Sequence, residues 1–534
     1  MVEESSPGHN RDDEMNSSTN LAHSIIRQLI ECGISDFVLS PGSRNAPLSI
    51  ALHEAAAANL IELHVKIDER GAAFFALGLA KASDNYVVVI CTSGTAAANF
   101  HPAVLEAFHS QAKLLIITAD RPAKLRKTGA NQTTNQVDLY QGVATHDFAT
   151  AIQIAHLLIG GPVHLNPQFE EPLIPNEKID WLNGLHVTSL PKESKSGPKL
   201  SVQDGVLVVG HDRGGFSTDQ ISALIKNLNW PVIAEDPISF PQATAHASLF
   251  LADEQIRNKL AANTVIVIGR TTLSRSTNAF IALAKKLIVI DPRVSKIDSA
   301  RSGDQLLSAI PVAVECDQSP DQNWQAAAAS AAGALETLGW SEQAAIIEIA
   351  ESIPDEAALF VGSSRPIRDI EAFVHPRAGV TVFANRGLAG IDGNISTIFG
   401  VAQKFEKTFA ILGDLTYLHD ISALVNKSAQ NLRIFVIDNN GGGIFSTLPQ
   451  AKVDGFEELV GTPHNLDLFA VTKGFGVAVT KVSNLVELQA VISKPVAGFD
   501  VVIIQTPSRT ENADRLKELT HMVSKAVRIG INLA

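Results

Sequence analysis

The stretch Ile411–Phe445, ILGDLTYLHDISALVNKSAQNLRIFVIDNNGGGIF, covers the end of one short apolar run and the whole of a second, each followed by polar residues. The first run, residues 409–412, leads into Asp414, and the second, residues 434–437, leads into Asn439. Apolar residues at helical spacing lie between them, so the pattern predicts strand, helix and strand. Such crossovers join parallel strands with one handedness. We therefore expect Asp414 and Asn439 at one edge of a parallel sheet, where open α/β sheets bind ligands.

The residues at this edge offer oxygen ligands. Asp414 contributes a carboxylate, Asn439 an amide oxygen, and Gly441–Gly443 a turn with exposed carbonyls. Mg²⁺ prefers such ligands and could complete an octahedral shell with phosphate oxygens and water. Glycines, which lack Cβ atoms, let the main chain approach a ligand closely. The alternative is a solvated strand end, because Asp and Asn are common in βα turns.

The bulk composition narrows the class of protein. A chain of 534 residues is too long for one core, and about three domains are expected. A net charge of −13 argues against nucleic-acid binding, which needs a basic face. The three cysteines are scattered without metal-binding spacing, which favours a reducing cytoplasm. No apolar run approaches the roughly 18 residues that span a membrane, and residues 1–19 form a polar tail that we expect to be disordered.

The first third of the chain alternates predicted helices and strands that end in polar loops. A strand at residues 36–39 runs into a loop with Arg44, which is either a surface charge or a clamp for a carboxylate. A strand at residues 63–67 runs into Glu69, and a helix rich in alanine and phenylalanine follows. Partial burial would raise the pKa of Glu69 and suit it to proton transfer. The alternative is a glutamate that stabilises the helix dipole.

An internal repeat relates the two ends of the chain. Arg70-Gly71 is followed by a helix, a strand ending at Gly94 and a strand ending at Asp120. Arg386-Gly387 is followed by the same series, with strands ending at Gly413 and Asp438. The spacings are 24 and 26 residues in the first copy and 27 and 25 in the second. Two copies of one parallel α/β unit explain this order; chance similarity between α/β units is the alternative.

The region between the copies has its own predicted strands and no catalytic motif. Residues 172–200 are rich in Pro, Lys, Ser and Gly, as linkers are. The glycine turn at 210–215 lacks the G-x-G-x-x-G pattern of a dinucleotide site, so we interpret it as structural. Walker, H-E-x-x-H and G-x-S-x-G motifs are absent, so a bound cofactor is expected to carry the chemistry.

Several motifs together resemble one family of thiamine-diphosphate enzymes. They are SPGSRNAPL, DERGAAFFALGLAK, TSGTAAANFHPAV, TADRP, GANQTTNQ, NRGLAGIDG, GDL and NNGGGIFSTLP, in this order along both outer parts of the chain. They are similar to the SEPHCHC synthase family (2-succinyl-5-enolpyruvyl-6-hydroxy-3-cyclohexene-1-carboxylate synthases) of menaquinone biosynthesis. Leu415 and Asp438 depart from the general Gly-Asp-Gly and Asn-Asn pattern of such enzymes.

The resemblance implies an α/β fold of three doubly wound parallel-sheet domains, the first and third similar to each other. The expected domains are pyrimidine-binding at 20–180, central and Rossmann-like at 200–340, and diphosphate-binding at 350–534. It also implies a cytoplasmic homodimer with active sites shared between subunits, and leaves open whether such dimers pair into tetramers.

The resemblance further implies the reaction and its residues. The enzyme would be a transferase that decarboxylates 2-oxoglutarate and adds the product to isochorismate, using thiamine diphosphate and Mg²⁺ or Mn²⁺. The catalytic residue would be Glu69, and the metal ligands Asp414, Asn439 and the carbonyl of Gly441. The cofactor-binding residues would be Ser364, Gly390, Ile391, Leu415, Thr416, Asn439 and Ile444. The substrate-binding residues would be Ser43, Arg44, Arg121, Gln132, Arg275, Arg368, Arg386, Phe445 and Leu448. Arginine suits these dicarboxylate substrates because its two-pronged guanidinium binds a carboxylate through two hydrogen bonds.

Three alternatives compete with this interpretation. Another thiamine-diphosphate enzyme, such as acetohydroxyacid synthase or a 2-oxo acid decarboxylase, would need fewer arginines on its site loops. A nicotinamide-dependent oxidoreductase would need a fingerprint that the central region lacks. A non-catalytic scaffold would have no need to keep Glu69, Asp414 and Asn439 together.

Overall fold

The described part of the chain forms two compact units. The computed structural model describes residues 17–176, 179–188, 190, 197–293, 302–317, 322–336, 338–426 and 431–533. The first unit is built from 1–108 and 112–192, and the second from 109–111 and the residues after 192, within those described ranges. The first holds one six-stranded sheet, and the second holds a five-stranded, a two-stranded and a six-stranded sheet.

The sheet of the first unit is parallel throughout, with the strand order β2-β1-β3-β4-β6-β5. Its strands are β1 Asp36–Leu39, β2 Glu62–Val65, β3 Val87–Cys91, β4 Leu114–Thr118, β5 Ala144–Phe148 and β6 Val163–Pro167. Its helices are α1 Ser17–Glu31, α2 Ala46–Ala57, α3 Glu69–Ser83, α4 Thr95–Asn99 and α5 His101–Ser110. Strands β3 and β4 are buried at every residue, as expected where helices cover both faces of a parallel sheet.

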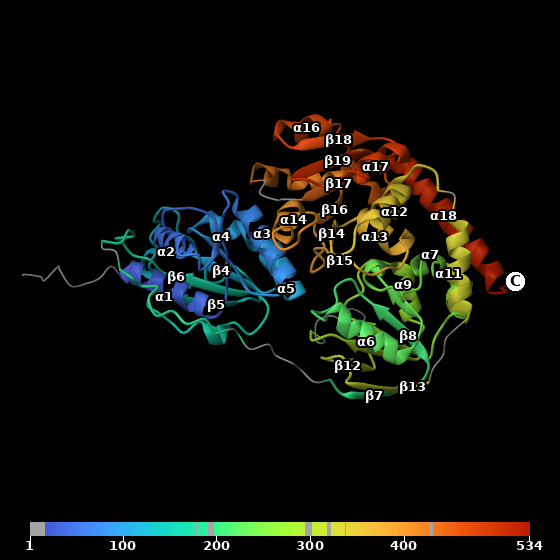
Figure 1. Cartoon of the computed structure of the whole chain (residues 1–534), viewed down its shortest axis with the longest axis horizontal. Coiled ribbons are helices and arrows are strands. Elements are labelled where there is room, and N and C mark those ends of the chain that lie inside the picture. Colours follow the sequence, from blue (N-terminus) through green and yellow to red (C-terminus); the bar gives the residue numbers. More distant parts are fainter. Residues whose placement is uncertain are drawn as a thin grey trace, which may run out of the picture. The chain divides into compact units, whose positions relative to one another are not determined.

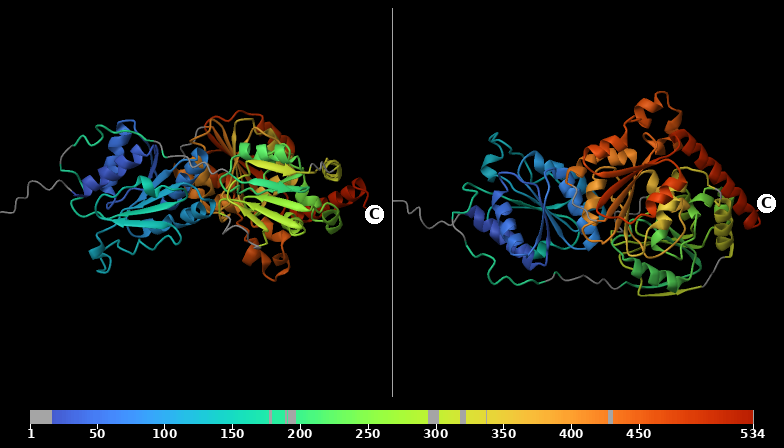
Figure 2. Two further views of the ribbon diagram at one scale, coloured as in Figure 1. Left: turned by 90° about the horizontal axis from the view of Figure 1, so that it is seen from below. Right: turned by 45° about the horizontal axis from the view of Figure 1, so that its top comes forward.

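The C-terminal six-stranded sheet repeats this topology. Its order is β15-β14-β16-β17-β19-β18, which is the order of the first sheet with each strand number raised by thirteen. The strands are β14 Ala358–Val361, β15 Thr381–Phe383, β16 Thr408–Gly413, β17 Leu432–Asp438, β18 Ala478–Val482 and β19 Phe499–Gln505. The helices are α12 Glu342–Ser352, α13 Arg365–Phe373, α14 Asn394–Val401, α15 Asp414–His419, α16 Leu468–Gly474, α17 Leu485–Ile492 and α18 Arg509–Gly530. Figure 2 shows helices on both faces of this sheet (orange and red). The predicted repeat is thereby confirmed.

The central sheet is parallel as well, with the order β12-β11-β10-β8-β9. Its strands are β8 Gly205–Val209, β9 Val232–Ala234, β10 Thr264–Ile268, β11 Lys286–Ile290 and β12 Gln305–Leu307. The separate two-stranded sheet pairs β7 Lys199–Val202 with β13 Ala313–Cys316. The neighbouring helices are α6 Thr218–Leu228, α7 Ala247–Phe250, α8 Glu254–Lys259, α9 Arg275–Ile281 and α11 Gln322–Ala334. The predicted class, three parallel α/β sheets with the first and third alike, therefore describes the fold.

One apolar core joins the central and C-terminal sheets. Helices α11 and α18 lie side by side along the edge of the second unit (Figure 1, yellow and red). Phe250 and Trp324 from the central region share a cluster with Phe373 and Val523 from the C-terminal region. Because this core is continuous, the loops of the two sheets have fixed positions relative to each other within the second unit.

One boundary differs from the sequence-based expectations. Helix α1 begins at Ser17, so the polar tail predicted for residues 1–19 ends at least three residues earlier. Ser18 and Thr19 are buried, and the Ser18 hydroxyl donates to the carbonyl of Glu170 at 2.6 Å. Residues 1–16 lie outside the described residues. Within the described ranges, no helix combines the length and the apolar content that crossing a membrane requires.

Candidate active site

A cavity of about 540 Å³ opens at the carboxyl ends of β14, β16 and β17 in the second unit. Eleven of the residues predicted for the cofactor, the metal and the substrates line it: Ser364, Arg368, Arg386, Ile391, Asp414, Leu415, Thr416, Asn439, Gly441, Ile444 and Phe445. They come from the four segments that follow β14, β15, β16 and β17, which parallel strands deliver to one edge of the sheet. The structure therefore brings most of the predicted site of this unit together.

The carboxylate of Asp414 accepts several backbone hydrogen bonds at the polar edge of the sheet. Its side chain is buried, and Oδ2 accepts from the backbone N–H of Gly441 at 2.8 Å and of Asn439 at 3.3 Å. Oδ1 accepts from the backbone N–H of Leu415 at 2.6 Å. This carboxylate thus ties the end of β16 to the turn after β17, as the strand–helix–strand pattern predicts.

The side-chain amide of Asn439 has a hydrogen-bond partner for its nitrogen but, among the described residues, none for its oxygen. Its Nδ2 donates to Oε1 of Glu342, whereas its Oδ1 is buried and has no hydrogen-bond partner among the described residues. A buried amide oxygen without a partner is costly unless a ligand satisfies it. A cation bound by this oxygen and by Asp414 would supply that partner, so the residues present fit a hard metal ion.

Close contacts at Gly441 and Gly443 leave no room for a Cβ atom, so the turn requires glycine there. Gly441 has a φ of +134°, and a Cβ there would lie 2.4 Å from the carbonyl oxygen of Gly461. A Cβ on Gly443 would lie 2.5 Å from Nδ2 of Asn439. The turn can therefore approach both the neighbouring segment and the Asn439 side chain only because it is made of glycine.

Helix α13 presents its N-terminus to the cavity. Ser364 is its N-cap with a φ of +77°, and its hydroxyl makes no capping hydrogen bond. Ser364, Arg365 and Pro366 all line the cavity. A helix N-terminus with a neighbouring arginine favours an anionic group such as a diphosphate.

Three acids near Asp414 illustrate how burial acts here. Burial raises the pKa of Glu342, and the positive charge of Arg365 opposes that shift. Burial raises the pKa of Asp369 to about 7, although Arg365 also pairs with it. Burial likewise raises the pKa of Asp438, and the charge of Asp414 adds to this rise. Burial thus favours the neutral forms of these acids, and a cation bound nearby would favour their ionised forms.

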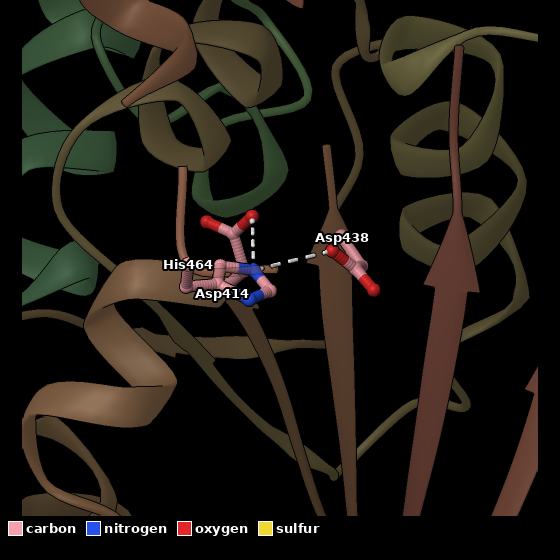
Figure 3. Close-up of side chains that lie close together, drawn as sticks. All are labelled: Asp414, Asp438 and His464. Carbon is pink, nitrogen blue, oxygen red and sulfur yellow. Dashed lines mark hydrogen bonds and ion pairs between the residues drawn. The ribbon is translucent and has the colours of Figure 1, made fainter. Parts of the chain in front are cut away.

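Figure 3 shows Asp414, Asp438 and His464, whose ligand-type atoms lie within 4.8 Å of one another. His464 Nε2 lies 3.3 Å from Asp414 Oδ2 and 3.5 Å from Asp438 Oδ1. The other ring nitrogen, Nδ1, accepts from the backbone N–H of Leu466 at 3.0 Å, so Nε2 carries the proton and donates. The hydrogen bond to Asp414 raises the pKa of His464. His464 is therefore placed to orient Asp414 as a hydrogen-bond donor.

Four arginines form part of the cavity lining, called here the arginine wall. They are Arg270, Arg365, Arg368 and Arg386. Arg386 is buried and donates to Thr272 Oγ1 at 2.7 Å, and Arg368 donates to the carbonyl of Ser364 at 2.6 Å. So many guanidinium groups make an anion-binding cavity within an acidic protein.

A buried carboxylate network supports these arginines. Glu235 accepts from the backbone N–H of Thr272 and of Leu273, each at 2.7 Å. Burial raises the pKa of Glu371 well above its usual value, the charge of Glu235 raises it further, and Arg368 opposes the rise. The central sheet thereby helps to hold the arginine wall of the C-terminal sheet.

The remaining predicted residues of the second unit lie outside the cavity lining. Arg275 is exposed at the start of α9, and Leu448 follows the short helix Gly443–Thr447. Gly390 lies beside Ile391, and a Cβ on it would lie 2.2 Å from Oδ1 of Asp392. In contrast, Glu342, Arg270 and Thr272 line the cavity although no motif pointed to them. For Glu342, the one local signal is Ser341, a typical helix N-cap directly before it. Arg270 and Thr272 have no such signal, because their partners lie far away in the chain.

Five predicted residues belong to the first unit. Arg121 donates to Ser93 Oγ at 2.5 Å and to the carbonyl of Gln132 at 2.8 Å. Arg44 donates to the carbonyl of Phe169 at 3.0 Å; burial lowers the pKa of Arg44, and the charge of Arg121 lowers it further. Ser43 and Gln132 are exposed on these loops. Four of the five residues, Ser43, Arg44, Arg121 and Gln132, thus lie on loops at the carboxyl edge of the first sheet.

Glu69, the fifth, begins α3. Asp68 caps that helix by accepting from the backbone N–H of Arg70 at 3.1 Å, and Glu69 is half-buried, as the sequence predicted. Its charge adds to the effect of burial in raising the pKa of the Cys91 thiol at the end of β3. Glu69 therefore lies near the carboxyl ends of the strands in its own sheet.

Comparisons with known proteins agree with this geometry. A family described as "Thiamine pyrophosphate enzyme, N-terminal TPP binding domain" matches residues 19–139, and "Middle domain of thiamine pyrophosphate" matches residues 176–361. The chain is 36% identical to a 2-succinyl-5-enolpyruvyl-6-hydroxy-3-cyclohexene-1-carboxylate synthase of a Nocardioides species, over 94% of this chain and 98% of that protein. It is also 36% identical to the synthase of that name from Thermobifida fusca, over 96% and 100%. Benzoylformate decarboxylase from Polynucleobacter necessarius shares the fold, with a TM-score of 0.67 at 14% identity over 93% of this chain and 99% of that one.

Proposed function

Because this chain belongs to the family of 2-succinyl-5-enolpyruvyl-6-hydroxy-3-cyclohexene-1-carboxylate synthases, which depend on thiamine diphosphate, we propose that it decarboxylates 2-oxoglutarate and adds the product to isochorismate. Bond formation with isochorismate makes the enzyme a transferase of menaquinone biosynthesis. The observation that carries the proposal is the joining of an arginine wall and the Asp414–Asn439 edge in one cavity.

Thiamine diphosphate, when bound, supplies the nucleophilic carbon and accepts the electron pair that remains when CO₂ leaves. Asp414, Asn439 Oδ1 and the Gly441 carbonyl hold Mg²⁺ or Mn²⁺ against the diphosphate. The partnerless Asn439 Oδ1 supports this assignment. Ser364, Leu415 and Thr416 contact the diphosphate, and the N-terminus of α13 favours its charge.

The apolar residues of the site shape the cofactor and exclude water. Ile391 and its neighbour Gly390 support the bent shape of the cofactor between its two rings. Ile444, Phe445 and Leu448 form an apolar wall that keeps water from the reacting carbon. The presence of Ile391, Ile444 and Phe445 in the cavity lining supports these roles.

The arginines bind the two dicarboxylate substrates. Arg368 and Arg386 do so in the cavity of the second unit, together with Arg275 at the start of α9. Arg44, Arg121, Ser43 and Gln132 bind the same substrates from the first unit of the partner subunit. Bidentate pairing with carboxylates orients both substrates for bond formation.

Glu69 exchanges a proton with the aminopyrimidine ring of the cofactor. We place Glu69 of one subunit opposite the cavity of its partner, in a cytoplasmic homodimer; the three free cysteines favour that reducing compartment. Residues 20–180, 200–340 and 350–534 serve as the pyrimidine-binding, central and diphosphate-binding domains.

The test is isochorismate consumption by the purified chain with thiamine diphosphate, Mg²⁺ and 2-oxoglutarate, each omitted in turn. We expect consumption to require all three, to vanish in Asp414→Ala and to persist in Asp454→Ala, which removes an exposed carboxylate. Release of CO₂ with isochorismate untouched would refute the acceptor. Turnover of pyruvate in place of 2-oxoglutarate would favour the acetohydroxyacid synthase alternative.

A further inference from the structure

The side-chain nitrogen of Asn439 is hydrogen-bonded to a residue 97 positions away in the chain. Glu342 Oε1 accepts from Asn439 Nδ2, and both residues line the cavity. Glu342 is the acceptor in this hydrogen bond, so the amide presents its NH₂ group to Glu342. The amide oxygen is therefore turned away from Glu342, and among the described residues this oxygen has no hydrogen-bond partner.

Glu342 itself is fixed by its own surroundings. It occupies the first position of α12, whose N-cap Ser341 accepts from the backbone N–H of Ala344 at 3.2 Å. The backbone N–H of Glu342 donates to Asn512 Oδ1 at 3.2 Å, and Asn512 Nδ2 donates to the carbonyl of Pro507 at 2.7 Å. Glu342 is therefore a rigid acceptor, held between α12 and the start of α18.

The same nitrogen side of the amide also faces the glycine turn. A Cβ on Gly443 would lie only 2.5 Å from Asn439 Nδ2, so the NH₂ group is confined between Gly443 and Glu342. Rotation of the amide by half a turn would place its oxygen against the Glu342 carboxylate, where two acceptors repel. The contacts thus select a single orientation of the Asn439 side chain.

We propose that Glu342 is a positioning residue that aims Asn439 Oδ1 at the metal ion. This inference rests on the proposed function, in which Asn439 is a metal ligand. Glu342 does not touch the metal; it fixes the rotamer and the amide orientation of a residue that does. Partners behind metal ligands commonly change metal affinity by 10- to 100-fold when they are removed.

The test measures Mn²⁺ affinity directly, by the loss of the free-ion electron paramagnetic resonance signal in the presence of thiamine diphosphate. We expect Glu342→Ala to weaken Mn²⁺ binding by about tenfold or more. Glu342→Gln keeps an acceptor oxygen at the same place and should stay within about threefold of the unchanged chain. Glu351→Ala, which removes an exposed glutamate from the other end of α12, is the matched control and should leave the affinity unchanged.

The outcomes separate this inference from the function on which it rests. No Mn²⁺ binding by the unchanged chain would refute the metal site itself. Normal binding by the unchanged chain and equal binding by Glu342→Ala would overturn the positioning role alone. A purely structural role would lower the thermal midpoint of the metal-free variant and leave the Mn²⁺ affinity of its folded form unaltered. If Glu342→Ala does not fold, the inference depends on Glu342→Asp. This variant keeps the charge but moves the carboxylate away from Asn439, so it should also weaken Mn²⁺ binding.

Discussion

Individual side chains of the cavity depend on partners that come from other parts of the second unit. Arg386 follows β15 but donates to Thr272, which follows β10 of the central sheet. Asn439 follows β17 but is held by Glu342 of α12. A guanidinium anchored in this way has its position set, so binding a carboxylate costs it little further side-chain freedom.

At this scale we expect Arg386→Lys to lower kcat/KM for the dicarboxylate substrates by about 10- to 100-fold. Lysine keeps the charge, but it lacks the planar, two-pronged group through which arginine binds a carboxylate by two hydrogen bonds. Steady-state kinetics with each substrate varied in turn would measure the loss. Arg515→Lys, an exposed substitution on α18, should have no effect; equal kinetics for both variants would contradict the role of Arg386.

At the scale of elements, the turn at Gly441–Gly443 is braced by the segment that precedes α16. The backbone N–H of Gly442 donates to the carbonyl of Gly461 at 2.8 Å. Asn440 and Asn465 exchange two hydrogen bonds, of 2.9 and 2.8 Å. A glycine-rich turn has high entropy when unfolded, so these contacts are needed to hold it in one conformation.

The first sheet is stabilised differently, by polar side chains that hydrogen-bond across β4, β5 and β6. His164 Nε2 lies 2.7 Å from Thr118 Oγ1, and its Nδ1 lies 3.0 Å from Thr145 Oγ1. Burial lowers the pKa of His164 to about 3. The imidazole is therefore neutral in the folded protein at every pH at which the enzyme would work.

This lowered pKa predicts acid sensitivity of the first unit. Below the ordinary histidine pKa of about 6.5, the unfolded chain takes up a proton at His164 and the folded chain does not. The free energy of unfolding should thus fall as the pH drops from 6.5 toward 3, by up to about 1.4 kcal/mol per pH unit. Denaturant unfolding between pH 5 and 7 should show a weaker pH dependence for His164→Gln than for the unchanged chain. Parallel curves would contradict the prediction, and the exposed substitution His156→Gln is the control.

At the scale of the whole molecule, the proposed site residues are divided between the two units. Glu69 belongs to the first unit, and Asp414 belongs to the second. The same strand order in the first and third sheets means that both present their carboxyl ends as ligand-binding edges. Two such edges from different subunits would make two equivalent sites in a symmetric dimer.

Shared sites predict complementation between inactive variants. Glu69→Ala and Asp414→Ala should each be inactive as homodimers. A heterodimer of the two, purified through two different tags, would contain one intact site and one doubly defective site, so we expect about half of the activity of the unchanged dimer. An inactive heterodimer would place Glu69 and Asp414 of each site in the same subunit.

The sequence by itself determined the strands, the internal repeat and the polar sheet edge at Asp414 and Asn439 of this protein. Apolar runs such as Val87–Cys91 and polar ends such as Asp414 are local signals, and parallel crossovers leave little choice of where those ends lie. Only the tertiary structure decided which distant residues meet at that edge. Glu342, Arg270 and Thr272 have no local pattern, because their positions depend on the core that α11 and α18 share and on contacts across about a hundred residues. Local periodicity encodes the elements, whereas the packing of whole sheets selects the partners of each side chain.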